Sequence, residues 1–254
     1  MIFNNYLFIN SPLEQFEINV VYPLFFFSSV DISITNSTIY VLFSFLFSFF
    51  FLFFSTKNLK LIPGRFQYLV EIIYIFIFDI LIKQASIKSQ NFFPLIFSIF
   101  FFVLISNVMG LTPFAFTPTS QIILTFIIAF SFFLGITFLG ILRQGVSFFN
   151  LFIPKGVPLA LLPLMILIEV MSYCIRPISL SVRLFANMLA GHTLLHIIAS
   201  FGVKLFFFNA ILAILPIFLL LAIIVLEIGI AFLQAYVFVI LSCIYLNDAL
   251  NSSH

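Results

Sequence analysis

Charged side chains are scarce in this sequence: Asp, Glu, Lys and Arg make up 7% of the 254 residues, whereas 64% are hydrophobic. A soluble globular domain carries about a quarter charged residues, so this chain has too few to cover a water-facing surface. The net charge of +2 and the lack of a basic run argue against nucleic-acid binding. The composition indicates a single all-α integral membrane domain over residues 1–254.

Cysteine is rare and tryptophan is absent, whereas 41 residues are Phe. Cys174 and Cys243 lie in apolar runs without a second cysteine or metal ligand at a useful spacing, so we expect two buried thiols that act as small apolar side chains. Phe, Ile, Leu and Asn have AT-rich codons, which is typical of an AT-biased organelle genome. Residues 1–10 lack the features of a secretory signal or a transit peptide. Both observations fit synthesis inside the organelle that receives the protein.

Three apolar runs predict transmembrane spans at residues 38–55, 92–111 and 121–142. Each run is close to the 20 or so residues that cross a hydrocarbon layer about 30 Å thick. Residues 1–37 contain no Lys or Arg, whereas residues 57–65 contain three. The positive-inside rule therefore places the N-terminal segment on the outer side of the membrane.

Residues 63–88 have a different character. With about 100° per residue, their polar side chains fall within less than half of the helix circumference. These side chains are Gln67, Glu71, Asp79 and Lys83. Such a stripe predicts an amphipathic helix on the inner membrane surface; a spanning helix is the alternative.

The last hundred residues contain two apolar-dominated segments, which we expect to form helices at 158–200 and 205–249. As a single helix, each would be roughly 63 Å long, about twice the hydrocarbon thickness. Pro177 and Gly229 are the candidate breakpoints near their centres, and neither lies in a polar turn. We therefore predict two long, strongly inclined membrane helices joined by a hairpin at 201–209, which brings the fold to about six helices. Four conventional spans are the alternative.

Ionisable residues inside these long helices are costly, at about 2.5–3.5 kcal/mol each near a helix centre, so a functional role is the default hypothesis. A structural ion pair is the alternative for any one of them. Glu169, Arg176 and Arg183 follow at intervals of seven, which returns a helix to within about 20° of the same direction. Asn187, four residues after Arg183, extends this stripe. His192, nine residues after Arg183, lies about 180° away around the helix.

The second long helix carries a similar stripe, formed by Glu227, Gln234 and Asp248. We expect this helix to pack antiparallel to the first. His192 and His196 are four residues apart and face the same way, as imidazoles that bind a metal ion do. A metal ion at this pair is therefore one hypothesis, although two ligands alone do not define a metal site. The alternative is one proton-relay histidine beside an incidental one.

This set of groups is poorly suited to covalent chemistry. The sequence contains no HExxH motif, no Gly-rich phosphate loop and no nucleophile with a recognisable base partner. Carboxyl, imidazole and amide groups along membrane helices suit proton transfer, because imidazole titrates near neutrality. Arginine differs from them, since it stays protonated.

The segment SLSVRLFANMLAGHTLL (Ser179–Leu195) resembles the signature of subunit a of the F-type ATP synthases. Similarity extends through SPLEQFEI (Ser11–Ile18), NVMGLTPFAFTPTSQ (Asn107–Gln121) and LEIGIAFLQAYVFVILSCIYLNDAL near the C-terminus. The resemblance covers almost the whole chain, although the 66–90 stretch matches poorly.

The resemblance implies roles for particular residues. It makes Arg183 the family's essential arginine and Asn187 the asparagine of the same segment. It assigns His192 and Glu227 to the half-channel through which protons arrive from the outer side. Bacterial members usually carry this acid and imidazole the other way round, so the arrangement resembles the mitochondrial branch. Glu169 matches the acid on the matrix side.

The resemblance further implies that Gln234 and Asp248 match polar positions of the last helix, and that Arg183 separates two aqueous half-channels beside a rotating ring of subunit c. ATP chemistry would lie on other subunits, so the chain itself would not be an enzyme and would require no cofactor. The expected partners are the ring, the peripheral stalk, other membrane-sector subunits and bound lipid. The expected location is the mitochondrial inner membrane, crossed several times, with the gene in the mitochondrial genome.

Two other classes of protein fit less well. An antiporter-like subunit of a respiratory complex usually carries lysine and glutamate in broken helices and has more spans. An intramembrane enzyme would need a nucleophile with its base, or a metal triad.

Overall fold

The protein is described here by a computed structural model. The described residues are 16–23, 25–26, 30–31, 33–57, 59–85, 87–112, 116–153, 161–209 and 211–250. Most of the SPLEQFEI motif, the first ten residues and the positively charged loop around Lys155 lie outside these residues.

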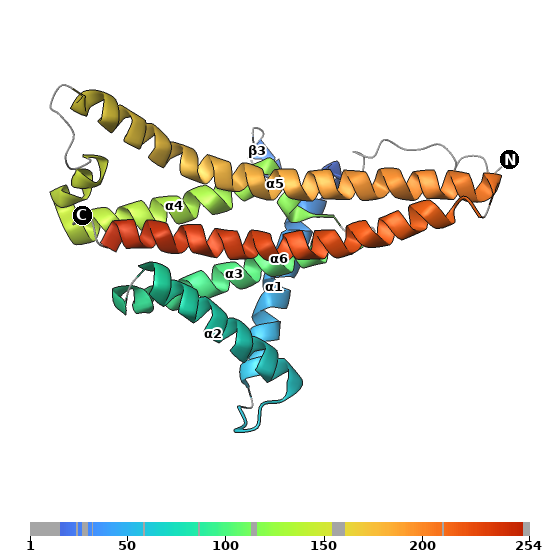
Figure 1. The fold of residues 1–254 in the computed structure, drawn as a ribbon, viewed down its shortest axis with the longest axis horizontal. Coiled ribbons are helices and arrows are strands. Elements are labelled where there is room, and N and C mark those ends of the chain that lie inside the picture. The colour runs from blue at the N-terminus through green and yellow to red at the C-terminus, as the bar shows by residue number, and fades with distance from the viewer. Residues whose placement is uncertain are drawn as a thin grey trace.

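Six α-helices account for most of the described chain (Figure 1). They are α1 (Asn36–Thr56), α2 (Arg65–Ala85), α3 (Phe93–Gly110), α4 (Ile122–Gln144), α5 (Leu162–Phe208) and α6 (Ile214–Leu250). In the described part of the chain, all of these except α2 belong to helical segments that are long and apolar enough to cross a membrane. The all-α membrane fold with about six helices is therefore confirmed.

Short elements connect the helices. Three are 3-10 helices: η3 (Ile87–Phe92), η4 (Pro118–Ser120) and η5 (Gly145–Phe152). Ahead of α1, β1 (Val20–Tyr22) pairs antiparallel with β4 (Ile34–Thr35), and β2 (Phe25–Phe26) pairs with β3 (Val30–Asp31). The sequence pattern did not predict these small strands.

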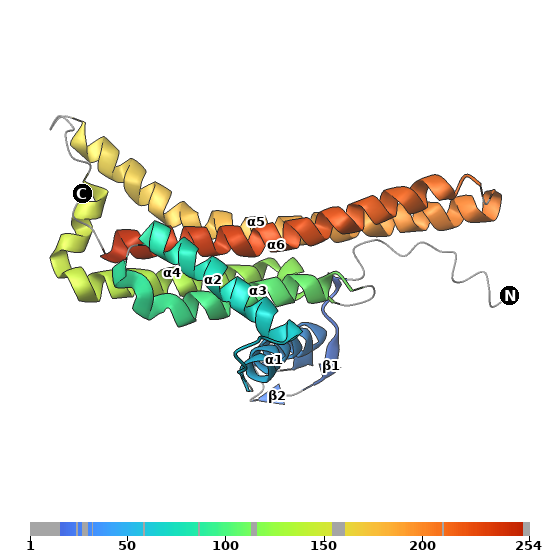
Figure 2. The same cartoon turned by 60° about the horizontal axis from the view of Figure 1, so that its bottom comes forward.

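Helices α5 and α6 lie side by side and extend well beyond the other helices at their hairpin end (Figure 1, Figure 2). Both helices are continuous, with 47 residues in α5 and 37 in α6, so the alternative of four conventional spans is wrong. Pro177 lies inside α5 without ending it. At 1.5 Å per residue α5 is about 70 Å long, which suits a helix that is strongly inclined in a membrane.

Helix α5 continues to Phe208 and α6 begins at Ile214, so the expected turn at 201–209 is wrong. Between residues 201 and 208 only Gly202 and the exposed Lys204 could weaken the helix, and the helix continues through both. Asn209 ends the helix: its backbone N–H donates to the Leu205 carbonyl at 2.8 Å, and its side-chain oxygen accepts from the Ile211 N–H at 3.0 Å. Such a hydrogen bond from the backbone to an Asn side chain favours a turn over continuation of the helix.

Helix α6 is the centre of the packing, because it contacts α2, α3, α4 and α5. Its Phe238 is buried together with Phe100 of α3, Ile77 of α2 and Leu184 of α5. Cys243 is buried as expected, whereas Cys174 is exposed on α5, so the expectation of two buried thiols is wrong for Cys174. The core thus forms around α6, where α2, α3, α4 and α5 pack against it.

Helix α2 packs its apolar side against the other helices, with Ile77 and Leu81 fully buried. Its polar stripe is used in part internally, because the Gln67 amide donates to the Lys60 carbonyl at 3.1 Å and to the Glu71 carboxylate at 2.7 Å. These bonds hold the loop between α1 and α2. The position of α2 on the inner membrane surface stays a prediction.

Candidate functional site

The polar stripes of α5 and α6 face each other along the seam of the hairpin. At one level the Asn187 amide of α5 donates to the side-chain oxygen of Gln234 on α6 at 3.0 Å. One turn further along, the Glu227 carboxylate of α6 lies against Gly191 of α5, where any Cβ would collide with it. The expected antiparallel packing is confirmed by these contacts, and the small residue lets the two helices approach closely.

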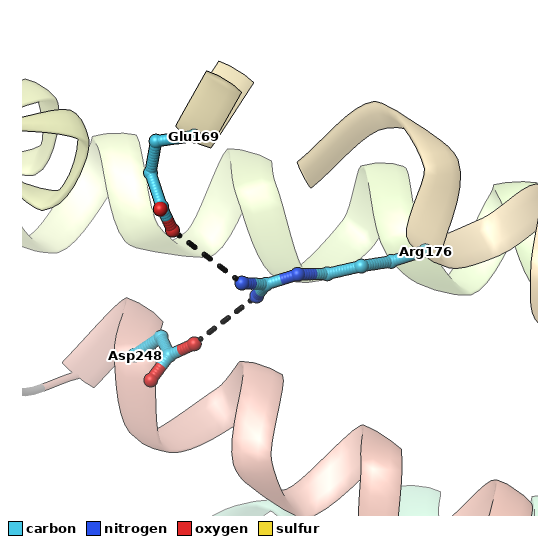
Figure 3. Close-up of polar contacts among 3 residues, drawn as sticks. All are labelled: Glu169, Arg176 and Asp248. Carbon is cyan, nitrogen blue, oxygen red and sulfur yellow. Dashed lines mark hydrogen bonds and ion pairs between the residues drawn. The ribbon is translucent and has the colours of Figure 1, made fainter. Parts of the chain in front are cut away.

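At the other end of the seam, Arg176 of α5 lies between two carboxylates (Figure 3). Its guanidinium is 3.3 Å from the Asp248 Oδ2 on α6 and 3.8 Å from the Glu169 Oε1 on its own helix. The rings of Tyr173 and Tyr245 lie 5.3 and 5.2 Å from the guanidinium carbon, within cation–π distance. Arg176 is thus neutralised inside the chain.

Arg183 has a different environment although it continues the same stripe. Its side chain is exposed on α5, and it forms no hydrogen bond or ion pair with the described residues. A guanidinium stays charged under all ordinary conditions, and an unpaired charge in a membrane helix is expensive. Within the described residues the site is therefore incomplete, because Arg183 lacks a partner of opposite charge.

Glu227 is only 6% exposed, and its Oε2 has no hydrogen-bond partner in the described part of the chain. The same holds for the His192 Nε2, the Gln234 Nε2 and the Asn107 Oδ1. Buried polar atoms without a partner usually bind water. Three of these four residues were predicted as site residues, and their unpaired buried atoms indicate a region that binds water.

Asn107 was not predicted as a site residue, although it is the most polar residue of its span. The structure places it on α3 against α6, where its amide approaches the Ala231 carbonyl at 3.5 Å. Ala231 lies one turn after Glu227. The sequence signal that could have identified Asn107 is a polar amide near the end of an otherwise apolar run.

His192 lies beside Phe16, with ring centroids 6.3 Å apart and an edge-on arrangement. The Phe16 carbonyl accepts a hydrogen bond from the Gln121 amide at 3.0 Å. Phe16, ahead of the first strand, thus contacts both this histidine and Gln121, the residue directly before α4. His192 and His196 have no third His, Cys, Asp or Glu at metal-binding distance among the described residues.

A long apolar hairpin with a seam of ionisable groups defines a class: polytopic membrane proteins with polar pathways inside the hydrocarbon layer. The comparisons with known proteins identify the family within this class. Residues 37–247 match the family described as ATP synthase A chain, and the chain belongs to that family.

Two relatives show how far the similarity extends. ATP synthase subunit a of Acanthamoeba castellanii is 50% identical over 256 residues, which cover both chains completely. ATP synthase subunit a of Pelagibacter ubique (strain HTCC1062) is 44% identical over 244 residues, which cover 96% of this chain and 99% of that protein. The resemblance found in the sequence is confirmed.

Proposed function

We propose that this chain is the proton-translocating stator subunit in the membrane sector of an ATP synthase. It provides two half-channels that meet a rotating ring of acidic c subunits, and Arg183 separates them. The observation that carries this proposal is the contrast between two arginines of one stripe. Arg176 is neutralised by Glu169 and Asp248, whereas Arg183 is exposed without a partner in the described chain.

An exposed guanidinium in the membrane suits a partner carboxylate that comes and goes. The charge of Arg183 favours the ionised form of any carboxylate that faces it and repels a proton that would pass straight through. Each elementary charge that crosses the membrane gains about 2.3 kcal/mol per 100 mV. That energy drives rotation only if the direct leak is closed.

The uptake path would run past His192 and Glu227 to the ring, with Asn187 and Gln234 as its inner polar groups. The unpaired buried atoms of His192, Glu227 and Gln234 support this assignment, because each needs water. Gly191, which contacts Glu227, lies eight residues from Arg183, or about 12 Å along the helix. Protons would therefore reach the ring on one side of the arginine.

The release path would run beside Glu169 and Asp248, which are partly exposed around Arg176. Glu169 lies fourteen residues before Arg183, or about 21 Å along the helix in the opposite direction from Gly191. The two acid groups thus lie on opposite sides of Arg183. This separation is what offset half-channels require.

The wider assignment follows from the proposed role. The chain would work in the mitochondrial inner membrane, with its gene in the mitochondrial genome, beside the c ring, the peripheral stalk and other membrane-sector subunits. It would need no cofactor, and ATP chemistry would take place elsewhere in the complex. A metal ion at His192 and His196 stays a prediction, which metal analysis of the purified complex would test.

The decisive experiment is Arg183→Ala in the assembled complex, with proton-driven ATP synthesis measured in vesicles. We expect synthesis to be lost while the complex still assembles. Lys204→Ala is a matched control, because Lys204 is an exposed cation on the same helix near the hairpin turn. Retained synthesis in Arg183→Ala would overturn the proposal.

A further inference from the structure

A groove between α3, α4 and α6 holds an apolar cavity of about 120 Å³ that no part of the proposed proton pathway uses. Its walls include Phe92 at the end of η3, Leu95 at the start of α3, Gly135 and Leu139 of α4, and Leu246 of α6. We call this space the α3–α4 groove. Because Gly135 has no atom within 4 Å of an added Cβ, the groove is open above that residue.

Among the described residues of the groove wall, Ser131 alone has a polar side chain. Its hydroxyl donates to the carbonyl of Ile128 in its own helix at 3.0 Å. The serine therefore presents no unpaired donor to an occupant. An occupant of this groove would be a hydrocarbon chain.

One end of the groove leads to a positive charge. Ser131, Gly135, Leu139 and Arg143 follow at intervals of four and so lie along one face of α4. The Arg143 guanidinium lies over the ring of Phe92, 5.5 Å from its centroid, and Phe92 is itself part of the groove wall. The ring thus joins the apolar walls to the cation.

Arg143 lies in the last turn of α4, where a membrane-spanning helix reaches the headgroup level. It forms no ion pair with an acidic side chain in the described chain. A guanidinium binds phosphate oxygens through charge-assisted, often paired hydrogen bonds. The groove and the cation therefore match the two parts of one molecule, an acyl chain and a phosphate.

We propose that the α3–α4 groove binds one anionic phospholipid, with an acyl chain beside Gly135 and Leu139 and the headgroup phosphate on Arg143. The site is selective for negative charge because the cation lacks an acidic partner in the described residues. Its described lining contains residues of α3, α4 and α6 but none of α5, so it is distinct from the seam of α5 and α6.

Photocrosslinking of the assembled complex in phosphatidylcholine vesicles tests the proposal. Each vesicle preparation contains a trace of one probe, either phosphatidylglycerol or phosphatidylcholine, that carries a diazirine in its acyl chain. Labelled peptides are mapped by mass spectrometry. We expect the phosphatidylglycerol probe to label the Ser131–Leu139 segment roughly tenfold more than the phosphatidylcholine probe. Both probes carry a phosphate, so the preference comes from their net charge: Arg143 repels the choline cation of phosphatidylcholine. A tenfold preference corresponds to about 1.4 kcal/mol.

Variants separate the two halves of the site. Arg143→Gln should remove the preference for phosphatidylglycerol, and Arg143→Lys should keep most of it. Gly135→Phe should fill the groove and reduce labelling by both probes, whereas Leu134→Phe, on an exposed neighbouring position, should not.

Three results would overturn the proposal. Equal labelling by the two probes in the unmodified complex would mean that only bulk lipid covers the groove. If Arg143→Gln left the labelling unchanged, the arginine would play no part in lipid binding. No lipid labelling of the segment, together with a crosslink to another subunit, would mean that a protein helix occupies the groove.

Discussion

Replacing Gly191 by Ala tests whether the close contact between α5 and α6 controls the position of Glu227. A Cβ at residue 191 would lie 3.0 Å from the Glu227 Cδ and 3.3 Å from its Cγ, and closer still to Oε1. The carboxylate must therefore move. Overpacking of this kind costs about 1–3 kcal/mol.

The matched control is Gly229→Ala on α6, because nothing lies within 4 Å of an added Cβ there. Both replacements gain about 1 kcal/mol of helix propensity, so a difference between them reports the contact with Glu227. If the whole cost falls on proton passage, Gly191→Ala slows it by between about 5-fold and 150-fold.

The assay is passive proton conductance of the membrane sector in vesicles, with assembly of the complex measured in parallel. We expect normal assembly in both variants and slower conductance in Gly191→Ala alone. Equal conductance in the two variants would refute the idea that Glu227, held against Gly191, lies on the proton path.

Other predictions concern the remaining contacts of the seam and the core. Asp248→Asn should weaken the ion pair with Arg176 and lower the free energy of unfolding. Because both groups are partly exposed, the loss should be less than the 3–5 kcal/mol of a fully buried pair. Unchanged stability together with unchanged proton release would contradict this. Gln234→Leu should cost about 1 kcal/mol through loss of the bond from Asn187, measured by a double-mutant cycle in detergent, where a coupling near zero would exclude the contact. The Ser106 hydroxyl of α3 donates to the Ser44 hydroxyl of α1 at 3.3 Å. Ser106→Ala should cost only about 0.6 kcal/mol in the same unfolding assay, the average for a hydrogen bond between membrane helices. A loss several times larger would show that this bond is not the main role of Ser106.

The extents of the spanning helices were predictable from the sequence. The helix expected at 38–55 is Asn36–Thr56, and the one expected at 121–142 is Ile122–Gln144. These ends fall where an apolar run meets polar residues, because backbone groups in the hydrocarbon layer must be satisfied within a helix. The same argument gave the two long helices of the hairpin.

The contacts between the long helices were not predictable to the same degree. Intervals of seven identified the stripe of Glu169 and Arg176, but not Asp248 as the second partner of Arg176. That pairing depends on the register of α5 against α6, which depends on where the turn lies. The chain from 201 to 208 has no strong stop signal, so local sequence placed the turn several residues too early.

This register has a consequence for the free arginine. A turn centred near residue 205 would set Glu227 opposite Arg183, and the chain would then cancel its own charge. Because α5 instead continues to Phe208 and α6 begins at Ile214, the acid lies at Gly191, about 12 Å further along α5. The length of α5 thus acts as a spacer. A deletion of about eight residues between Gly191 and Asn209 would bring Glu227 level with Arg183, so that the subunit could pair its own cation, whereas an insertion would move the acid further away.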